Sequence, residues 1–186
     1  RDRGGAEELT KSVQNGLQEL IEKTSKQEGL NVQDIFEIVL VGNPVMHHLV
    51  LGIDPVELGG APFALTLDTA VNCLAQEVGL RFNTATRVYL LPCIAGHVGA
   101  DAAGAVLAEA PQDSEEITLL IDIGTNAEII LGNCHHLMAA SSPTGPAFEG
   151  AQISSGQRAA VGAIERVRIN PNNYEPIYKV IGSDQW

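Results

Sequence analysis

The chain has 186 residues, which is enough for one domain with a substantial core. It is 45% hydrophobic but only 4% aromatic, so we expect a core of Ala, Val, Ile and Leu, as in folds that alternate strands with helices. The formal net charge of −12 argues against the cationic face that a nucleic-acid backbone requires, so we predict no nucleic-acid partner.

Cysteine usage and hydropathy indicate the compartment. Cys73, Cys93 and Cys134 are widely spaced and form no CxxC pair, so the chain carries neither a disulfide framework nor an iron–sulfur or zinc signature. A reducing, cytoplasmic location is the simpler interpretation. No apolar stretch is long enough to span a bilayer and the charged N-terminus is no signal peptide, so no membrane partner is predicted.

The first third of the chain predicts helices alternating with a strand. Apolar residues recur at helical spacing over residues 6–28, and Gly29 can end that helix. Residues 36–41 predict a buried strand. Asn43 then suits the N-cap of a short helix that starts at Pro44 and ends near Gly52, before a loop over residues 54–62.

The middle of the chain continues the alternation. Residues 68–78 predict a second helix, opened by Asp68 and closed by Gly79. Residues 87–91 predict a strand that Pro92 interrupts. A helix of small residues follows over 96–107, and its glycines and alanines allow close approach to a neighbouring helix or a ligand.

The last third predicts mostly strands. An acidic loop at 111–116 leads into a strand–turn–strand hairpin over 117–132, and residues 137–140 continue the strands. A glycine-rich connection over 141–156 precedes two closing strands at 163–169 and 177–181. This order of elements predicts an α/β domain with a mixed sheet.

The hairpin tip suits a phosphate chain. Gly124 lets the backbone come close to anionic oxygens, and Thr125 and Asn126 add neutral donors. Asp122 could hold Mg²⁺ through water, since magnesium takes few carboxylates and keeps most of its hydration shell. The alternative is an ordinary hairpin in which Asp122 caps its own turn.

Two further segments allow both a functional and a structural interpretation. Asp101 follows the start of the 96–107 helix, where it either favours the helix dipole or orients a water or Mg²⁺ beside a terminal phosphate. In the 141–156 connection, Gly145 and Gly150 either serve a plain loop or let the backbone approach a nucleotide. The nearest charged side chains, Glu149 and Arg158, either contribute there or pair with each other.

The histidine pairs make weak metal motifs. His47 and His48 are adjacent on a predicted helix and point in different directions, so we expect one in the core and one at the surface. The pair offers at most one ligand to a given metal, as does the pair His135 and His136, and no HEXXH spacing occurs. The G-x-S-x-G elbow and the P-loop lysine are missing from the sequence, which disfavours covalent hydrolases and Walker-type nucleotide binding.

The order of segments resembles the connect-1 helix and phosphate-2 hairpin of the ASKHA superfamily, which includes acetate and sugar kinases, heat-shock chaperone ATPases and actin. More closely, the chain resembles the ATPase part of the reductive activators of corrinoid proteins. Six stretches in the family's order carry the resemblance: 41–49, 58–63, 95–101, the 117–132 hairpin, 145–151 and 158–165. The fold this implies is an actin-like, ribonuclease H-like ASKHA subdomain with a mixed sheet flanked by helices.

The activity that the resemblance implies is ATP-dependent return of an oxidised cob(II)amide methyl-carrier protein to cob(I)amide. Electrons would arrive through a [2Fe–2S] cluster outside this chain. By resemblance, Asp122, Gly124, Thr125 and Asn126 would contact the phosphates and Mg²⁺, and Asp101 would position the attacking water. Gly145 and Gly150 would lie near the nucleotide. The partner would be a corrinoid protein. The resemblance leaves open whether the protein forms a homodimer.

Departures from the family define further expectations. The family's first phosphate loop and [2Fe–2S] domain would precede Arg1, and its adenosine segment would follow Trp186. The chain also lacks an initiator methionine and stops at what reads as a strand exit, so we expect a fragment of a longer protein. We expect residues 1–186 to form a single α/β unit that, alone, binds ATP weakly and hydrolyses almost none. The alternatives are another ASKHA-class ATPase or small-molecule kinase, or a nucleotide-binding module without catalysis.

Overall fold

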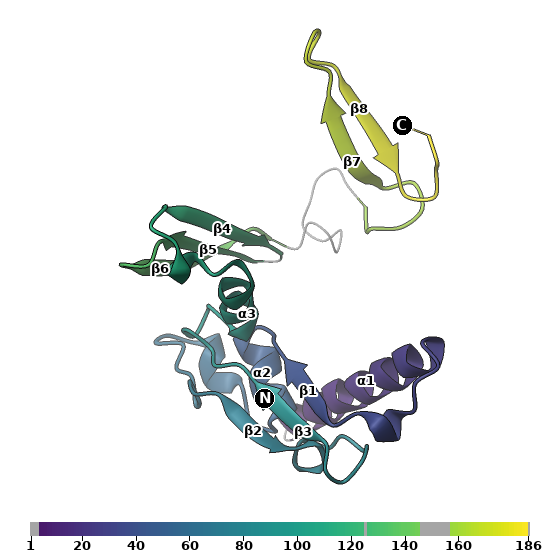
Figure 1. Ribbon diagram of the computed structural model, residues 1–186, viewed down its shortest axis with the longest axis vertical. Helices are drawn as coiled ribbons and strands as arrows, with labels where there is room; N and C mark the ends of the chain where they lie inside the picture. Colours follow the sequence, from purple (N-terminus) through teal and green to yellow (C-terminus); the bar gives the residue numbers. More distant parts are fainter. Residues whose placement is uncertain (1–3, 125, 146–156, 186) are drawn as a thin grey trace. The chain divides into compact units, whose positions relative to one another are not determined.

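Helices and strands alternate through the first half of the chain, and strands dominate the second half (Figure 1). The computed structural model describes residues 4–124, 126–145 and 157–185. The chain forms two compact units: one within Arg1–Leu120 and Ile130–Ala140, the other within Ile121–Ile129 and Ser141–Trp186. The helices and strands found in them confirm the predicted mixed α/β class.

The first unit contains a small mixed sheet. Its strands are β1 (Glu37–Leu40), β2 (Val71–Leu74) and β3 (Arg87–Leu90), in the order β1-β3-β2. The central strand β3 runs parallel to β1, pairing Val88 with Ile38, and antiparallel to β2, pairing Val88 with Cys73. The parallel pair requires a crossover connection, which here contains α2 (Pro44–Val50).

Apolar burial holds this sheet against α1 (Gly5–Gln27). The core consists of six buried residues: Val50, Ala75, Val78, Leu80, Val88 and Leu90. Val13 and Leu17 of α1 pack against it from their helical stripe. Gln18, which is 6% exposed, adds two hydrogen bonds to Arg81. Its side-chain amide accepts from Arg81 N at 2.8 Å and donates to Arg81 O at 3.1 Å.

Three predicted elements differ from the structure. Residues 68–78 are not a helix: β2 pairs with β3 there, and only the 3₁₀ turn η3 (Ala75–Val78) precedes Gly79. The strand at 36–41 is shorter and not buried, because β1 lies at one side of its sheet, and Val39 is 57% exposed. The small-residue helix α3 (Ala100–Glu109) begins later than expected, after a bridge between Ala95 and Val98.

The remaining short helices lie in connections. The 3₁₀ turns η1 (Val32–Asp34) and η2 (Val56–Gly59) precede β1 and follow α2, respectively. A third, η4 (Pro111–Asp113), continues directly from α3 toward the next sheet. No helix among the residues described has both the length and the apolar character needed to cross a membrane.

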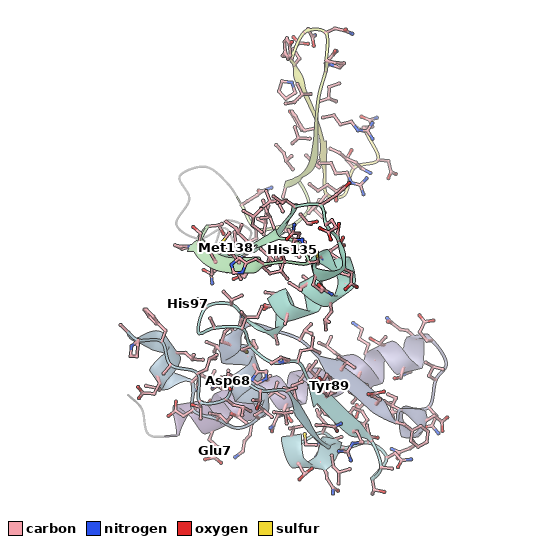
Figure 2. All side chains as sticks on the ribbon, turned by 60° about the vertical axis from the view of Figure 1, so that its left-hand side comes forward. Glu7, Asp68, Tyr89, His97, His135 and Met138 are labelled. Atoms are coloured by element: carbon pink, nitrogen blue, oxygen red, sulfur yellow. The ribbon has the colours of Figure 1, made fainter. Side chains whose placement is uncertain are left out.

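The predicted hairpin is present and is joined by a third strand. Strands β4 (Thr118–Ile123), β5 (Asn126–Gly132) and β6 (Leu137–Pro143) form a sheet in the order β4-β5-β6. Buried Ile130 of β5 packs with Val98 and Ala102, which belong to the start of α3 and the turn before it. The sheet also leaves large apolar side chains exposed, including Met138 of β6 at 55%, which is labelled in Figure 2.

The predicted closing strands form a separate antiparallel hairpin. Strands β7 (Ile164–Ile169) and β8 (Pro176–Val180) pair with Val167 opposite Tyr178. Every residue of β7 is exposed, and Val167 and Tyr178 are 59% and 53% exposed. A two-stranded hairpin with so little burial has marginal stability by itself, so this one depends on further packing partners.

Candidate functional site

The tip of the β4–β5 hairpin is the strongest candidate site. The Gly124 amide donates to Asn126 O at 2.8 Å, which closes the turn between the two strands. Asp122 lies near the end of β4 and is exposed, so its carboxylate can meet a ligand from solvent. Thr125 lies outside the described residues. The geometry gives an accessible carboxylate beside a tight glycine turn, as the sequence predicted.

The start of the glycine-rich connection lies at the same tip. The Thr144 hydroxyl donates a short hydrogen bond to Gly124 O, which brings its neighbour Gly145 to the hairpin. Gly145 has φ +85°, in the left-handed region that favours glycine, and no heavy atom of the described residues lies within 4 Å of the place where a Cβ would be. Gly150 and Glu149 lie outside the described residues. Four predicted residues, Asp122, Gly124, Asn126 and Gly145, are thus brought together.

A second hydrogen bond joins β6 to the hairpin. Ser141 of β6 donates its hydroxyl to a Glu128 carboxylate oxygen on β5 at 3.1 Å. This bond and the Thr144 bond fix the end of β6 to the hairpin at two points. A phosphate site requires such support, because backbone donors bind an anion well only when they are held in place.

Asp101 lies in the first unit at the start of α3. Its Oδ1 is 2.9 Å from the Ala102 amide, and it is half-buried. The Gly42 carbonyl accepts from the amides of Ala100 and Asp101 at 2.9 and 3.2 Å. The loop before α2 is therefore fastened to the N-terminal turn of α3, and two of the sequence stretches that carry the family resemblance meet here.

Gly99 permits this close approach. A Cβ at Gly99 would lie 2.5 Å from Asp101 Oδ1 and 2.7 Å from both Gly42 O and Asn43 Cα. Backbone atoms cannot yield at such distances, so a larger residue would separate the loop from the helix. Asn43 also caps α2 as predicted, since its side chain accepts from the Met46 amide at 2.9 Å.

The two neighbouring histidines are both buried, so the expectation of one core and one surface residue was wrong. His48 is fully buried and fully bonded: Nδ1 lies 2.8 Å from Pro44 O, and Nε2 accepts from the Thr66 amide at 3.1 Å. This pattern places the proton on Nδ1. The loop after α2 contacts His48 through Thr66, whereas His47 faces a cavity that Leu17 of α1 and Leu90 of β3 also line, and helical spacing alone does not reveal either environment.

His47 differs, because neither ring nitrogen has a hydrogen-bond partner among the described residues, although the residue is only 3% exposed. Burial lowers its pKa, His48 adds to that effect, and the Leu91 backbone partly offsets it. The ring lines a largely apolar cavity of about 210 Å³ together with Leu17, Val50 and Leu90. No pattern in the sequence predicts this orphaned ring.

The cysteines occupy three different environments. Cys93 is buried beside the start of α3, where burial raises its pKa, the Ala100 amide opposes the shift and Asp101 reinforces it. Cys73 is half-buried on β2, and Cys134 is exposed in the turn between β5 and β6. No sequence pattern indicates that Cys134 lies beside Glu115 and His135, because the whole β4–β5 hairpin separates Glu115 from the other two in the chain.

Similar proteins point to one family. The model described as the RACo middle region matches residues 1–113, and the model described as the C-terminal domain of RACo, the ASKHA domain, matches residues 116–186. The chain is 38% identical over 181 residues to "Corrinoid activation enzyme RamQ" of Eubacterium limosum, covering 96% of this chain and 30% of that protein.

Two further proteins agree. The "[Co(II) methylated amine-specific corrinoid protein] reductase" of Methanosarcina barkeri is 35% identical over 97 residues, which is 52% of this chain and 18% of that protein. The solved structure of a "Reductive activator for corrinoid,iron-sulfur protein" matches with a TM-score of 0.81 and 39% identity, covering 97% of this chain and 29% of that one. The chain spans less than a third of the length of these relatives.

The two family models account for almost every residue and meet at η4, between α3 and the hairpin. The 39% identity to a solved structure also confirms the predicted ASKHA, actin-like fold class. The chain therefore belongs to the RACo family of corrinoid activators, with its first 113 residues matching the middle region and residues 116–186 matching the C-terminal ASKHA domain.

Proposed function

We propose that this chain is part of an ATP-dependent activator that returns an oxidised cob(II)amide corrinoid protein to cob(I)amide. Membership of the RACo family carries the proposal, and two relatives are named for corrinoid activation and for reduction of a Co(II) corrinoid protein. These names favour an activator over a small-molecule kinase. The corrinoid protein is the proposed macromolecular partner, and the cytoplasm is the proposed location.

The nucleotide would bind at the hairpin tip. Gly124 and Gly145 allow the backbone to approach the phosphates, and Asn126 adds a side-chain donor at the same turn. Asp122, exposed on β4, would hold hydrated Mg²⁺. The bonds from Thr144 and Ser141 support this role, because they fix the backbone that would face the anion. By the family resemblance, Thr125 would also contact the phosphates and Gly150 would lie near the nucleotide.

ATP hydrolysis would supply the free energy for an unfavourable one-electron reduction. Asp101 would orient the attacking water through its carboxylate, which the Ala102 amide holds at the start of α3. The electron would come from a [2Fe–2S] cluster outside this chain, held by cysteines of the longer protein. Residues 1–186 would then form one wall of the ATP cleft.

The test is ATP turnover by the longer protein that contains this chain, comparing wild type with Asp122→Asn and a control. Loss of the Asp122 charge removes the proposed magnesium ligand, so we expect turnover to fall at least about 100-fold. The control is Asp34→Asn, an equal charge change at an exposed residue of η1, which should leave turnover unchanged. Equal turnover in wild type and Asp122→Asn would refute the proposed site.

A further inference from the structure

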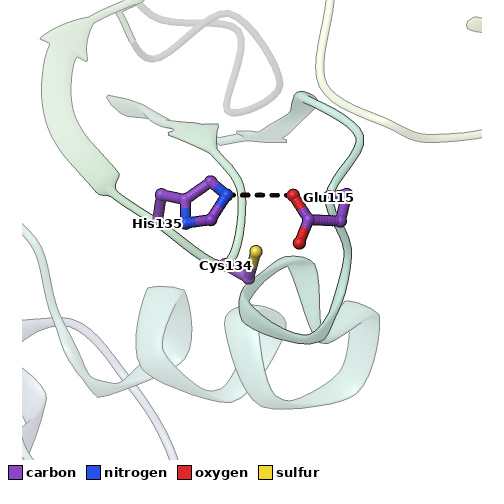
Figure 3. Close-up of side chains that lie close together, drawn as sticks. All are labelled: Glu115, Cys134 and His135. Carbon is purple, nitrogen blue, oxygen red and sulfur yellow. Dashed lines mark hydrogen bonds and ion pairs between the residues drawn. The ribbon is translucent and has the colours of Figure 1, made fainter.

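Three potential metal ligands converge at the base of the β4–β5 hairpin, where β4 begins and β5 ends. One carboxylate oxygen of Glu115, the Sγ of Cys134 and one ring nitrogen of His135 all lie within 4.8 Å of one another. Figure 3 shows the three side chains grouped together, with the His135–Glu115 contact dashed. That contact joins His135 Nε2 to Glu115 Oε2 at 2.9 Å.

The backbone holds these side chains on two fastened loops. The Cys134 amide donates to Ser114 O at 2.8 Å, and the Asn133 side chain donates to Glu115 O at 2.9 Å. Asn133 also accepts from the His135 amide at 3.1 Å, which shapes the turn that carries Cys134 and His135. The ligands therefore come from segments whose relative position is already fixed, which lowers the ordering cost of binding an ion.

The donor types select the class of ion. Thiolate and imidazole are ligands of Zn²⁺ and similar transition metals, whereas Mg²⁺ and Ca²⁺ take oxygen ligands. Ligands around a tetrahedral zinc lie about 3.3–3.8 Å apart, so small side-chain rotations within the observed 4.8 Å limit are sufficient. The side chains of His135 and Glu115 are 72% and 81% exposed, so the ion can enter directly from solvent.

We infer that Glu115, Cys134 and His135 form a zinc site, with water as the fourth ligand. On binding, the Cys134 thiol releases its proton to solvent and the Sγ–Zn bond forms, with no change of oxidation state. The carboxylate and thiolate then balance the charge of the ion. The net charge of −12 favours the approach of a cation. The bound ion would join the lead-in to β4 to the β5–β6 turn, independently of the nucleotide site proposed at the other end of the hairpin.

The test titrates the chelator-treated, reduced chain with Co²⁺ and then with Zn²⁺. We expect one equivalent of Co²⁺ to give the near-ultraviolet charge-transfer absorption of a thiolate ligand, and Zn²⁺ to displace it. Cys134→Ser should abolish that absorption. His135→Gln and Glu115→Gln should weaken zinc binding at least about tenfold while the thiolate band is retained at saturating Co²⁺. All three residues are exposed, so thermal melts should show these variants folded.

Matched controls lie close by. Cys73→Ser removes another thiol and His136→Gln removes the adjacent exposed histidine, and both should bind zinc like the wild type. A thiolate band that survives in Cys134→Ser, or equal zinc affinity in the wild type and all three ligand variants, would overturn the inference. The inference would also be overturned if the wild type bound Zn²⁺ no more tightly than Mg²⁺.

Discussion

His47 shows how one residue makes this core sensitive to pH. The ring is 3% exposed, and neither nitrogen has a hydrogen-bond partner among the residues that the structure describes. A buried polar group without a partner costs about 1–3 kcal/mol of stability. Protonation would add a charge inside a mainly apolar cavity, and burial accordingly lowers the pKa of His47.

This pKa shift predicts acid destabilisation from a single residue. In the unfolded chain His47 takes up a proton near its ordinary pKa of about 6.5, whereas in the folded chain it stays neutral to lower pH. The unfolded state therefore binds more protons, so the free energy of unfolding falls as the pH drops through this range and is unaffected above it. His47→Leu should flatten that fall in urea unfolding measured between about pH 7 and 5.

His136→Gln provides the comparison, since it removes an exposed histidine. We expect its pH profile to follow the wild type. A His47→Leu profile parallel to the wild type over the same interval would contradict the account of His47.

At the scale of elements, α1 is fastened to the sheet unit by a polar clamp as well as by apolar contacts. Gln18 bonds both the amide and the carbonyl of Arg81, and Gln14 donates to Val50 O at 3.2 Å. These bonds connect α1 to the loop after η3 and to the end of α2. Helices in small units gain most of their stability from such tertiary contacts, so the clamp helps to hold α1 in place.

Gln18→Leu tests the clamp. The change keeps a side chain of similar size but leaves both polar groups of Arg81 without their partner, which should cost about 1–3 kcal/mol. Glu19→Leu, the same substituent at the neighbouring exposed position, should change stability by less than about 0.5 kcal/mol. The measurement is the urea unfolding midpoint of each variant. Equal midpoints for Gln18→Leu and Glu19→Leu would show that the clamp does not contribute to the free energy of unfolding.

Local signals predicted some elements well and others poorly. The Asn43 cap with Pro44 predicted α2 correctly, and the two apolar runs around Gly124 predicted β4 and β5, because each signal acts within a few residues. The helix predicted over residues 68–78 was wrong, because pairing of β2 with β3 overrode the helical pattern of that segment. The exposure of β1 depends on its place in the sheet order, which no local pattern encodes.

Of the candidate sites, the hairpin tip could be predicted from the sequence and the cluster at the base of the hairpin could not. The turn at Gly124 and its neighbour Asp122 are contiguous in sequence, so their proximity was evident, and the bond from Thr144 adds Gly145 to them. The cluster of Glu115, Cys134 and His135 could not be predicted, since only pairing of the hairpin brings Glu115 to the following turn.

At the scale of the whole molecule, this chain matches only part of the length of its relatives. Two of these relatives are more than three times its length, and the family models that match it are those of the RACo middle region and of the C-terminal ASKHA domain. ASKHA proteins close two subdomains over ATP, so weak ATP binding and negligible hydrolysis by residues 1–186 alone remain predictions. We propose that, in the complete protein, energy from ATP drives the reduction of cobalt.

The most direct measurement follows the absorption spectrum of the corrinoid partner as it reacts with the longer protein that contains this chain and a low-potential reductant. We predict that cob(II)amide converts to cob(I)amide only when Mg²⁺ and ATP are both present, and that Asp122→Asn abolishes the conversion. Cob(I)amide formation at the same rate without ATP, or none with it, would contradict the account.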